Sequence, residues 1–208
     1  MGLDMYLYRI NKLNEHDVHL AEDLPYEKLT DEKYHFCTQV LGEKDDEESE
    51  DNRLIAPILP WVTVVRKDIE YIDWKKLKEI CKIPKDARIG GSHYGPGDYR
   101  CYKFYKDEVA YDAVWSSLTD EQKKYATVVE NHRVAVWREE EIAYWRKAYE
   151  LQAALHDACD TAILNCGYYP LNDAMRKVLL TKDPDEDTLP EIALESTKDS
   201  VVVYHEWY

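Results

Sequence analysis

The chain has 208 residues, of which 42 are acidic and 27 basic, so its formal net charge at pH 7 is −15. Hydrophobic residues make up 45% and charged residues 33%, a balance typical of a folded protein and too apolar for a disordered one. The negative charge argues against non-specific binding to DNA, RNA or anionic membranes, because each of them would repel the chain. Tyr (17) and Trp (6) far outnumber Phe (2), and rings with a polar tip suit wet interfaces and ligand sites.

The amino terminus predicts no export signal, because residues 1–7 contain no basic segment followed by an apolar run. Residues 54–65, which no other uncharged stretch exceeds in length, contain two prolines and are too short to span a bilayer. The five cysteines are an odd number without a CxxC pair, which favours reduced thiols over a disulfide framework. We therefore expect a cytoplasmic protein that does not contact membranes.

Charge is unevenly distributed along the chain. Residues 1–60 carry 15 acidic and 6 basic side chains, residues 61–138 carry 12 and 15, and residues 139–208 carry 15 and 6. The acid is concentrated in residues 43–51 and 183–199, each with seven acidic residues and one Lys. Such runs are usually solvated loops. The alternative is an acidic surface that imitates a phosphate backbone.

Short elements are predicted in the first part of the chain. Residues 3–9 alternate and predict a strand, and Thr30 begins a predicted helix that ends at about residue 41. Residues 61–66 are β-branched and aromatic, which favours a strand. Asp73 is a predicted N-cap for a short helix through residue 81.

The middle of the chain predicts a loop, a hairpin, a helix and a strand. Residues 88–99 contain four glycines and predict the loop, and residues 99–112 predict the hairpin. Thr119 and Gln122 form the capping-box pattern that begins a helix. Residues 134–137 predict the strand.

The longest helix is predicted from about residue 139 to about residue 163. Glutamates at its start oppose the positive end of the helix dipole. Its buried stripe is expected to consist of apolar residues at helical spacing, Ile142, Trp145, Tyr149, Leu155, Cys159 and Ile163. Gly167 is expected to end this helix, Asn172 to cap another helix through residue 180, and residues 201–204 to form a closing strand.

These elements predict an α+β fold in which a mostly antiparallel sheet is packed by one long central helix and several short helices. Residues 1–208 are expected to form a single domain, with residues 43–138 as a candidate insertion. No internal repeat or coiled-coil heptad pattern is present in the sequence.

Three sequence patterns point only weakly to chemistry. Residues 88–97 are glycine-rich but lack the Gly-Lys-Ser/Thr ending of a phosphate-binding loop. The pairs His16/His19 and His156/Cys159 each supply two ligands, which do not close a tetrahedral zinc site. The sequence also lacks the Gly-x-Ser-x-Gly pattern of serine hydrolases. We therefore expect no catalytic residues, no metal site and no cofactor.

A more informative segment reads Glu-Ile-Ala-Tyr-Trp-Arg-Lys-Ala and occupies residues 141–148. On a helix, Tyr144, Arg146 and Lys147 cannot all be buried together with Trp145, so some of them project into a cleft or into solvent. Adjacent Tyr, Arg and Lys side chains offer donors and stacking surface for an anion or a nucleobase. The structural alternative is that Trp145 lies in the core while Arg146 pairs with a glutamate one turn later.

This segment is one of three by which the chain resembles a family of small, uncharacterised phage and prophage proteins. Members of that family open with Met-Gly-Leu-Asp-Met-Tyr-Leu, carry Glu-(Ile/Val)-x-Tyr-Trp-Arg-Lys-Ala on a helix, and then Asn-Cys-Gly-x-Tyr-Pro. The matching pieces are residues 1–7, 141–148 and 165–170. Family members tend to follow the second piece with His and Trp, which residues 151–155 lack. The resemblance implies a phage setting but no particular activity.

The three pieces supply a set of candidate ligand-binding residues, which are Asp4, Tyr6, Tyr144, Trp145, Arg146, Lys147, Asn165 and Tyr168. In one arrangement they meet and line a polar, aromatic pocket. In the other, Asp4 is the salt-bridge partner of Arg146 in the core. The sequence leaves both arrangements open.

Three functions fit these observations. The first is a phage or mobile-element protein that binds a host nucleic-acid-targeting defence protein and inhibits it, as anti-CRISPR proteins do, with no direct contact to nucleic acid. Its acidic surface would comprise Asp45, Asp46, Glu47, Glu48, Glu50, Asp51, Asp183, Asp185, Glu186 and Asp187. The second is a sponge that binds a nucleotide-derived immune signal. The third is a nucleotide-processing enzyme with Asp4 or His93 as acid or base, for which no complete catalytic constellation is present.

Overall fold

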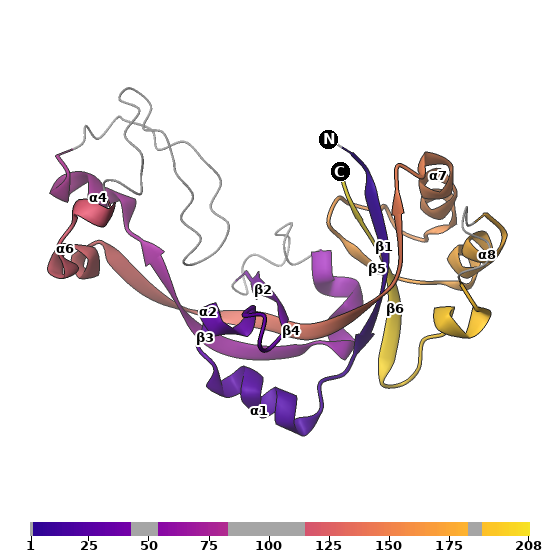
Figure 1. Cartoon of the computed structure of the whole chain (residues 1–208), viewed down its shortest axis with the longest axis horizontal. Coiled ribbons are helices and arrows are strands. Elements are labelled where there is room, and N and C mark those ends of the chain that lie inside the picture. Colours follow the sequence, from indigo (N-terminus) through magenta and orange to yellow (C-terminus); the bar gives the residue numbers. More distant parts are fainter. Residues whose placement is uncertain (1, 43–53, 83–114, 183–188) are drawn as a thin grey trace. The chain divides into compact units, whose positions relative to one another are not determined.

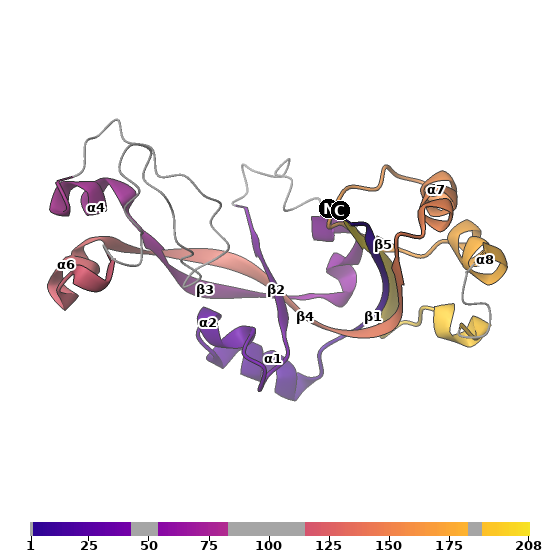
Figure 2. The same cartoon turned by 45° about the horizontal axis from the view of Figure 1, so that its top comes forward.

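The computed structural model describes residues 2–42, 54–82, 115–182 and 189–208 (Figures 1 and 2). The chain divides into two compact units. Unit 1 comprises Met1–Leu24, Lys28–Arg66 and Arg133–Tyr208, and unit 2 comprises Pro25–Glu27 and Lys67–His132.

Helices and strands alternate irregularly along the chain. Their order is β1 (Asp4–Asn11), α1 (Glu15–Asp23), α2 (Tyr26–Leu29), β2 (Cys37–Leu41), η2 (Ala56–Trp61), β3 (Thr63–Ile72), α4 (Trp74–Ile80), α6 (Asp120–Tyr125), β4 (Thr127–Arg146), α7 (Tyr149–Ala158), β5 (Tyr168–Pro170), α8 (Asp173–Lys182), η3 (Glu191–Leu194) and β6 (Ser200–Trp207). The strands form one sheet in the order β2-β4-β1-β6-β5, and β3 also pairs with β4. The β1/β4, β1/β6, β2/β4 and β5/β6 pairs are antiparallel. The prediction of an α+β fold with a mostly antiparallel sheet is confirmed.

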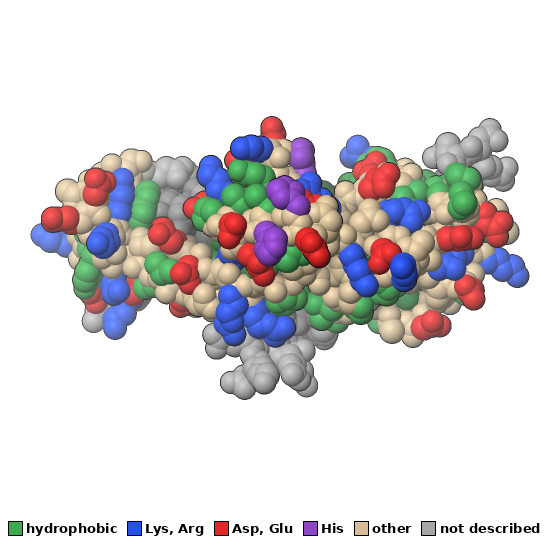
Figure 3. Space-filling model, turned by 90° about the horizontal axis from the view of Figure 1, so that it is seen from below, with side chains coloured by type: hydrophobic (Ala, Val, Ile, Leu, Met, Phe, Trp, Pro, Cys, Tyr) green, Lys and Arg blue, Asp and Glu red, His purple; other side chains and the backbone are tan. Residues whose placement is uncertain are grey.

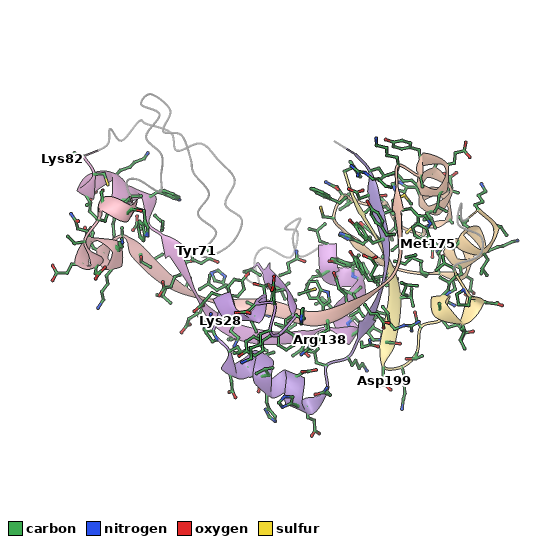
Figure 4. The ribbon with its side chains drawn as sticks, viewed as in Figure 1. Lys28, Tyr71, Lys82, Arg138, Met175 and Asp199 are labelled. Carbon is green, nitrogen blue, oxygen red and sulfur yellow. The ribbon has the colours of Figure 1, made fainter. Side chains whose placement is uncertain are left out.

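Strand β1 has a different environment on each of its two faces. Met5 and Leu7 are fully buried on the face that packs against α7 and α8 (Figure 1). Tyr6 and Tyr8 alternate with them and lie on the opposite face, because successive strand side chains point in opposite directions. The core on the helical side consists mainly of Leu3, Met5, Leu7, Trp145, Leu151, Leu155, Leu171, Met175, Leu179, Leu194, Val202 and Tyr204 (Figure 4).

The pairing of β1 with β4 contains one irregularity. Leu7 pairs with Ala143, but the next residue, Tyr8, pairs with Glu141, so Ile142 is an extra residue in β4. Such a bulge bends the strand and changes its alternation. In consequence, Tyr144 and Glu141 lie on the same face of the sheet, although one has an even and the other an odd residue number.

A second core in unit 1 lies on the opposite face, toward one end of the sheet. It contains the buried sheet residues Ile10, Val201 and Val203. They pack against Ile55, which directly precedes η2, and Ile58, which lies within it. At the same end of the sheet, an ion pair attaches helix α1 to strand β4. Arg138 of β4 donates to Asp17 of α1 over 2.9 Å, and its guanidinium carbon lies 4.5 Å from the ring centroid of Phe36 (Figure 4).

Unit 2 has its own small core of Ile72, Leu77, Leu118 and Ala126. Helices α4 and α6 of this unit begin as the sequence predicts. The carboxylate of Asp73 accepts from two backbone amides at the start of α4, and Thr119 forms a complete capping box with Gln122 at the start of α6.

A buried carboxylate lies among the core residues of unit 1. Glu206 is fully buried and accepts three hydrogen bonds, from the Tyr204 hydroxyl at 2.6 Å, Gln152 Nε2 at 3.0 Å and His156 Nε2 at 3.0 Å. Burying a carboxylate is costly unless its oxygens are hydrogen-bonded. Burial, followed by the hydrogen bond to Glu206, raises the pKa of the Tyr204 phenol, so this donor keeps its proton.

The prediction of a long central helix over residues 139–163 is wrong. Residues up to Arg146 belong to β4, and the helix that follows, α7, has only ten residues. The Glu, Ala, Arg and Lys content of this region favours a helix in isolation, but hydrogen bonding to β1 overrides that preference. Lys147 separates strand from helix with a left-handed φ of 59°.

The predicted helix from Thr30 to residue 41 is also wrong. Residues 37–41 form β2 and pair with β4, and His35 just before them has a left-handed φ of 55°. Gly167 ends no helix, because it directly precedes β5. The hairpin predicted at residues 99–112 and the loop at 88–99 lie outside the described residues.

We expect Glu206→Ala to lower the free energy of unfolding by about 3 kcal/mol, because it leaves one buried and two partly buried donors without their acceptor. Urea denaturation followed by circular dichroism measures this. Glu150→Ala, an exposed glutamate on α7, is the control and should change the free energy of unfolding by less than about 0.5 kcal/mol. Equal stability of the two variants would show that the Glu206 network contributes nothing.

Candidate functional site

Five rings form a continuous patch on the sheet face that is turned away from α7 and α8. They are contributed by β1, β4, β5 and β6, and we call the patch the aromatic face: Tyr6, Tyr8, Tyr144, Tyr168 and His205. The register explains the gathering, since Tyr6 pairs with Tyr144 on one side and with His205 on the other, and His205 pairs with Tyr168. Tyr144 is 42% exposed and the other four rings are half-buried.

The rings contact one another throughout the patch. The centroids of Tyr6 and Tyr8 are 5.3 Å apart and their planes differ by only 9°. Tyr6 lies 4.9 Å from Tyr144, and Tyr168 lies 4.5 Å from His205 in a stacked arrangement. Centroid separations in this range are favourable for aromatic pairs, so the rings hold one another in place.

One end of the aromatic face carries an ion pair. The Tyr144 hydroxyl donates to Asp4 Oδ1 over 2.7 Å, and Arg146 Nε lies 3.7 Å from the same oxygen. The hydrogen bond to Asp4, with smaller effects of burial and charge, raises the pKa of the Tyr144 phenol. The Arg146 side chain is 66% exposed, so its guanidinium can contact a bound molecule.

The opposite end is anchored by a half-buried carboxylate. Glu139 Oε2 accepts from Trp137 Nε1 at 3.1 Å and from the Tyr168 hydroxyl at 3.4 Å. Burial raises the pKa of Glu139. Burial and the neighbouring Glu139 raise the pKa of the Cys37 thiol to about 12, so Cys37 is protonated and a poor nucleophile.

His205 contributes to the patch as a flat, uncharged ring. Its Nδ1 donates to the carbonyl oxygen of Gly167 over 3.0 Å. Burial lowers the pKa of His205, which favours the neutral imidazole. Gly167 itself has no room for a side chain, because an added Cβ would lie 2.5 Å from the Tyr169 ring. Any other residue at position 167 would therefore have to displace the Tyr169 ring.

The structure brings together five of the eight predicted ligand-binding residues. Asp4, Tyr6, Tyr144, Arg146 and Tyr168 share this face of the sheet. The prediction omitted three of its other members, which are Tyr8, Glu139 and His205. Tyr8 lies two residues after Tyr6 on a predicted strand. Because residues with this spacing share one face of a strand, the sequence already indicates that Tyr8 lies beside Tyr6.

The remaining three predicted residues lie elsewhere. Trp145 is 4% exposed and belongs to the core on the helical face. Lys147 follows the strand, and its backbone amide donates to the Leu3 carbonyl. The side-chain amide of Asn165 donates to the Tyr208 carbonyl oxygen and accepts from the Tyr208 backbone amide. A strand, unlike a helix, sends Tyr144 and Trp145 to opposite faces, which resolves how the segment accommodates both.

Several predicted features lie outside the described residues. They are the ten acidic surface candidates, Asp45, Asp46, Glu47, Glu48, Glu50, Asp51, Asp183, Asp185, Glu186 and Asp187, together with His93 and the glycine-rich loop. Within the described ranges, no group of three His, Cys, Asp or Glu side chains is placed to hold a metal ion. No helix in those ranges combines the length and apolar character of a membrane span. Acidic and basic side chains are interspersed over the face shown in Figure 3.

We expect stability to fall at alkaline pH. Burial raises the pKa of the Tyr8 and Tyr168 phenols above the ordinary value of 10.0. Above about pH 10 the unfolded chain loses these protons while the folded chain keeps them, so the free energy of unfolding decreases as pH rises. Urea denaturation at about pH 8 and about pH 11 measures the change, and Tyr168→Phe should reduce it. Identical pH dependence of wild type and Tyr168→Phe would contradict the assignment.

Comparison with known proteins identifies no relative. No family model, no curated protein and no solved structure matches the chain. The resemblance to phage proteins therefore stays a prediction, and the aromatic face is interpreted from its own residues.

Proposed function

We propose that this protein acts by binding: it is a phage or mobile-element accessory protein that inhibits a nucleic-acid-targeting defence protein of the host, and the aromatic face is its contact surface. The observation that carries this proposal is the run of exposed and half-buried tyrosines on a sheet face, beside carboxylates, in a chain of net charge −15. The free thiols of the described cysteines are consistent with action in the cytoplasm.

Tyrosines on a sheet suit protein recognition for two reasons. Tyr and Trp dominate the binding energy of many interfaces, because they bury a large area and offer a hydrogen bond at the tip. The Tyr6 ring is already in contact with both Tyr8 and Tyr144, so a partner orders few side chains when it binds.

The charge of the chain favours a basic partner. A protein that binds nucleic acid presents Lys and Arg to the phosphates. An acidic protein associates with such a surface faster than a neutral one does, and once bound it excludes the nucleic acid. The acidic residues of 43–51 and 183–187 remain a prediction for the same role.

A second candidate function is a sponge for a nucleotide-derived signal. The near-parallel Tyr6 and Tyr8 rings and the exposed guanidinium of Arg146 favour it, because aromatic stacking binds bases and guanidinium binds phosphate. The two functions differ in what Arg146 does. Arg146→Ala should abolish binding of a nucleotide and leave binding of a basic protein almost unchanged.

We expect Tyr144→Ala to weaken partner binding at least tenfold, since it truncates the most exposed ring of the aromatic face. The measurement is affinity purification from host lysate carrying defence systems, with bound proteins and small molecules identified by mass spectrometry. Binding of the purified partner to wild type and variant is then measured, and so is inhibition of the partner's contact with nucleic acid.

Tyr149→Ala is the matched control, because Tyr149 is 58% exposed but lies at the start of α7. It should bind the partner like wild type. Equal binding by the Tyr144→Ala variant would contradict the proposed contact surface. Recovery of a nucleotide in place of a protein would favour the sponge.

A further inference from the structure

The two ends of the aromatic face differ in charge. At one end, the exposed Arg146 is balanced by Asp4. At the other end, Tyr8 pairs in register with the exposed Glu141. Glu139 precedes Glu141 by two residues in β4 and lies on the same face. Within the part of the chain that the structure describes, the face therefore changes from the Asp4–Arg146 ion pair to two carboxylates beside Tyr8 that form no ion pair with a Lys or Arg there.

Burial and nearby carboxylates raise the pKa of both central tyrosines. Burial, and after it the carboxylates of Asp4 and Glu141, raise the pKa of the Tyr6 phenol, and Arg146 opposes them. At Tyr8 the contributions after burial come from Glu139, Tyr6 and Glu141, all in the raising direction. The neighbouring carboxylates therefore oppose a negative charge at both phenols, and the same carboxylates attract a cation that binds at these rings.

We propose that Tyr6, Tyr8 and Glu141 form a recognition site for the guanidinium of an arginine in a basic segment of the protein partner. This site rests on the proposed function, because it names the chemistry by which the aromatic face recognises that partner. The guanidinium packs against the stacked pair formed by the Tyr6 and Tyr8 rings, and the Glu141 carboxylate accepts its hydrogen bonds.

Arginine fits this site better than the alternatives. A lysine ammonium is a compact, strongly hydrated charge, whereas the planar guanidinium stacks on rings and matches a carboxylate with two parallel bonds. A nucleotide would stack equally well, but its phosphates would approach Glu141 and a chain of net charge −15. The fold already contains the proposed type of contact, since the Arg138 guanidinium carbon lies 4.5 Å from the Phe36 ring centroid.

The test measures fluorescence anisotropy of a short labelled peptide of alternating Arg and Gly, titrated with the full chain at about 0.15 M salt. Peptides with Lys or citrulline in place of Arg are the probe controls, because citrulline keeps the shape of arginine without its charge. We expect the Arg peptide to bind, the Lys peptide to bind more weakly, and the citrulline peptide not to bind.

The variants identify the site. Tyr6→Leu should weaken binding of the Arg peptide about tenfold and Tyr6→Phe should preserve it, because the ring and not the hydroxyl makes the contact. Glu141→Gln should weaken binding about fivefold. Glu140→Gln is the matched control, since it removes the same charge from the preceding residue of β4. Glu140 pairs in register with Arg9, and its side chain lies on the opposite face of the sheet.

Three other results would overturn the proposal. Equal losses in Glu140→Gln and Glu141→Gln would show that the peptide responds only to the net charge of the chain. Unchanged binding in Tyr6→Leu, with folding checked by urea denaturation, would place the peptide elsewhere. No peptide binding, combined with partner binding that is still lost in Tyr144→Ala, would exclude the arginine site while the proposed function stands. Peptide binding that depends on Tyr6 and Glu141, combined with partner capture insensitive to Tyr144→Ala, would support the site and contradict the proposed function.

Discussion

The structure of unit 1 depends on β1 being hydrogen-bonded along both edges, to β4 on one side and to β6 on the other. A strand in this position cannot shift by one residue without exchanging the environment of every side chain it carries. Met5 and Leu7 are fully buried against the helices, so the apolar core fixes the register. The aromatic face follows from that choice, because the same register places Tyr6 between Tyr144 and His205.

The two faces of the sheet satisfy their polar groups in different ways. The Glu206 carboxylate is enclosed and accepts hydrogen bonds from three neighbouring side chains, two of them on α7, which ties α7 to the last strand. On the opposite face, Asp4 and Glu139 accept hydrogen bonds from the hydroxyls of Tyr144 and Tyr168, while the Tyr144 ring is exposed and the Tyr168 ring is half-buried. The carboxylates thus restrain the tyrosines at their tips without covering them, which limits the entropy lost when a partner binds.

How far the sequence predicts this structure depends on how local each interaction is. The caps at Asp73, Thr119 and Asn172 are correctly predicted, because each needs only backbone amides a few residues away. The conformation of residues 139–146 is not, because pairing with β1, more than a hundred residues away, decides it. His205 is missed as a site residue for the same reason, since only cross-strand pairing places it beside Tyr6 and Tyr168.

The extra residue at Ile142 also has a consequence for comparing this chain with others of different length. Elsewhere within the paired part of β4, losing one residue would transfer every side chain beyond the deletion to the other side of the sheet. Losing Ile142 instead leaves Ala143 opposite Leu7 and Glu141 opposite Tyr8, as in an unbroken strand. A homologue whose strand is one residue shorter should therefore be aligned with its gap at this position, where the deletion straightens the strand and preserves both faces.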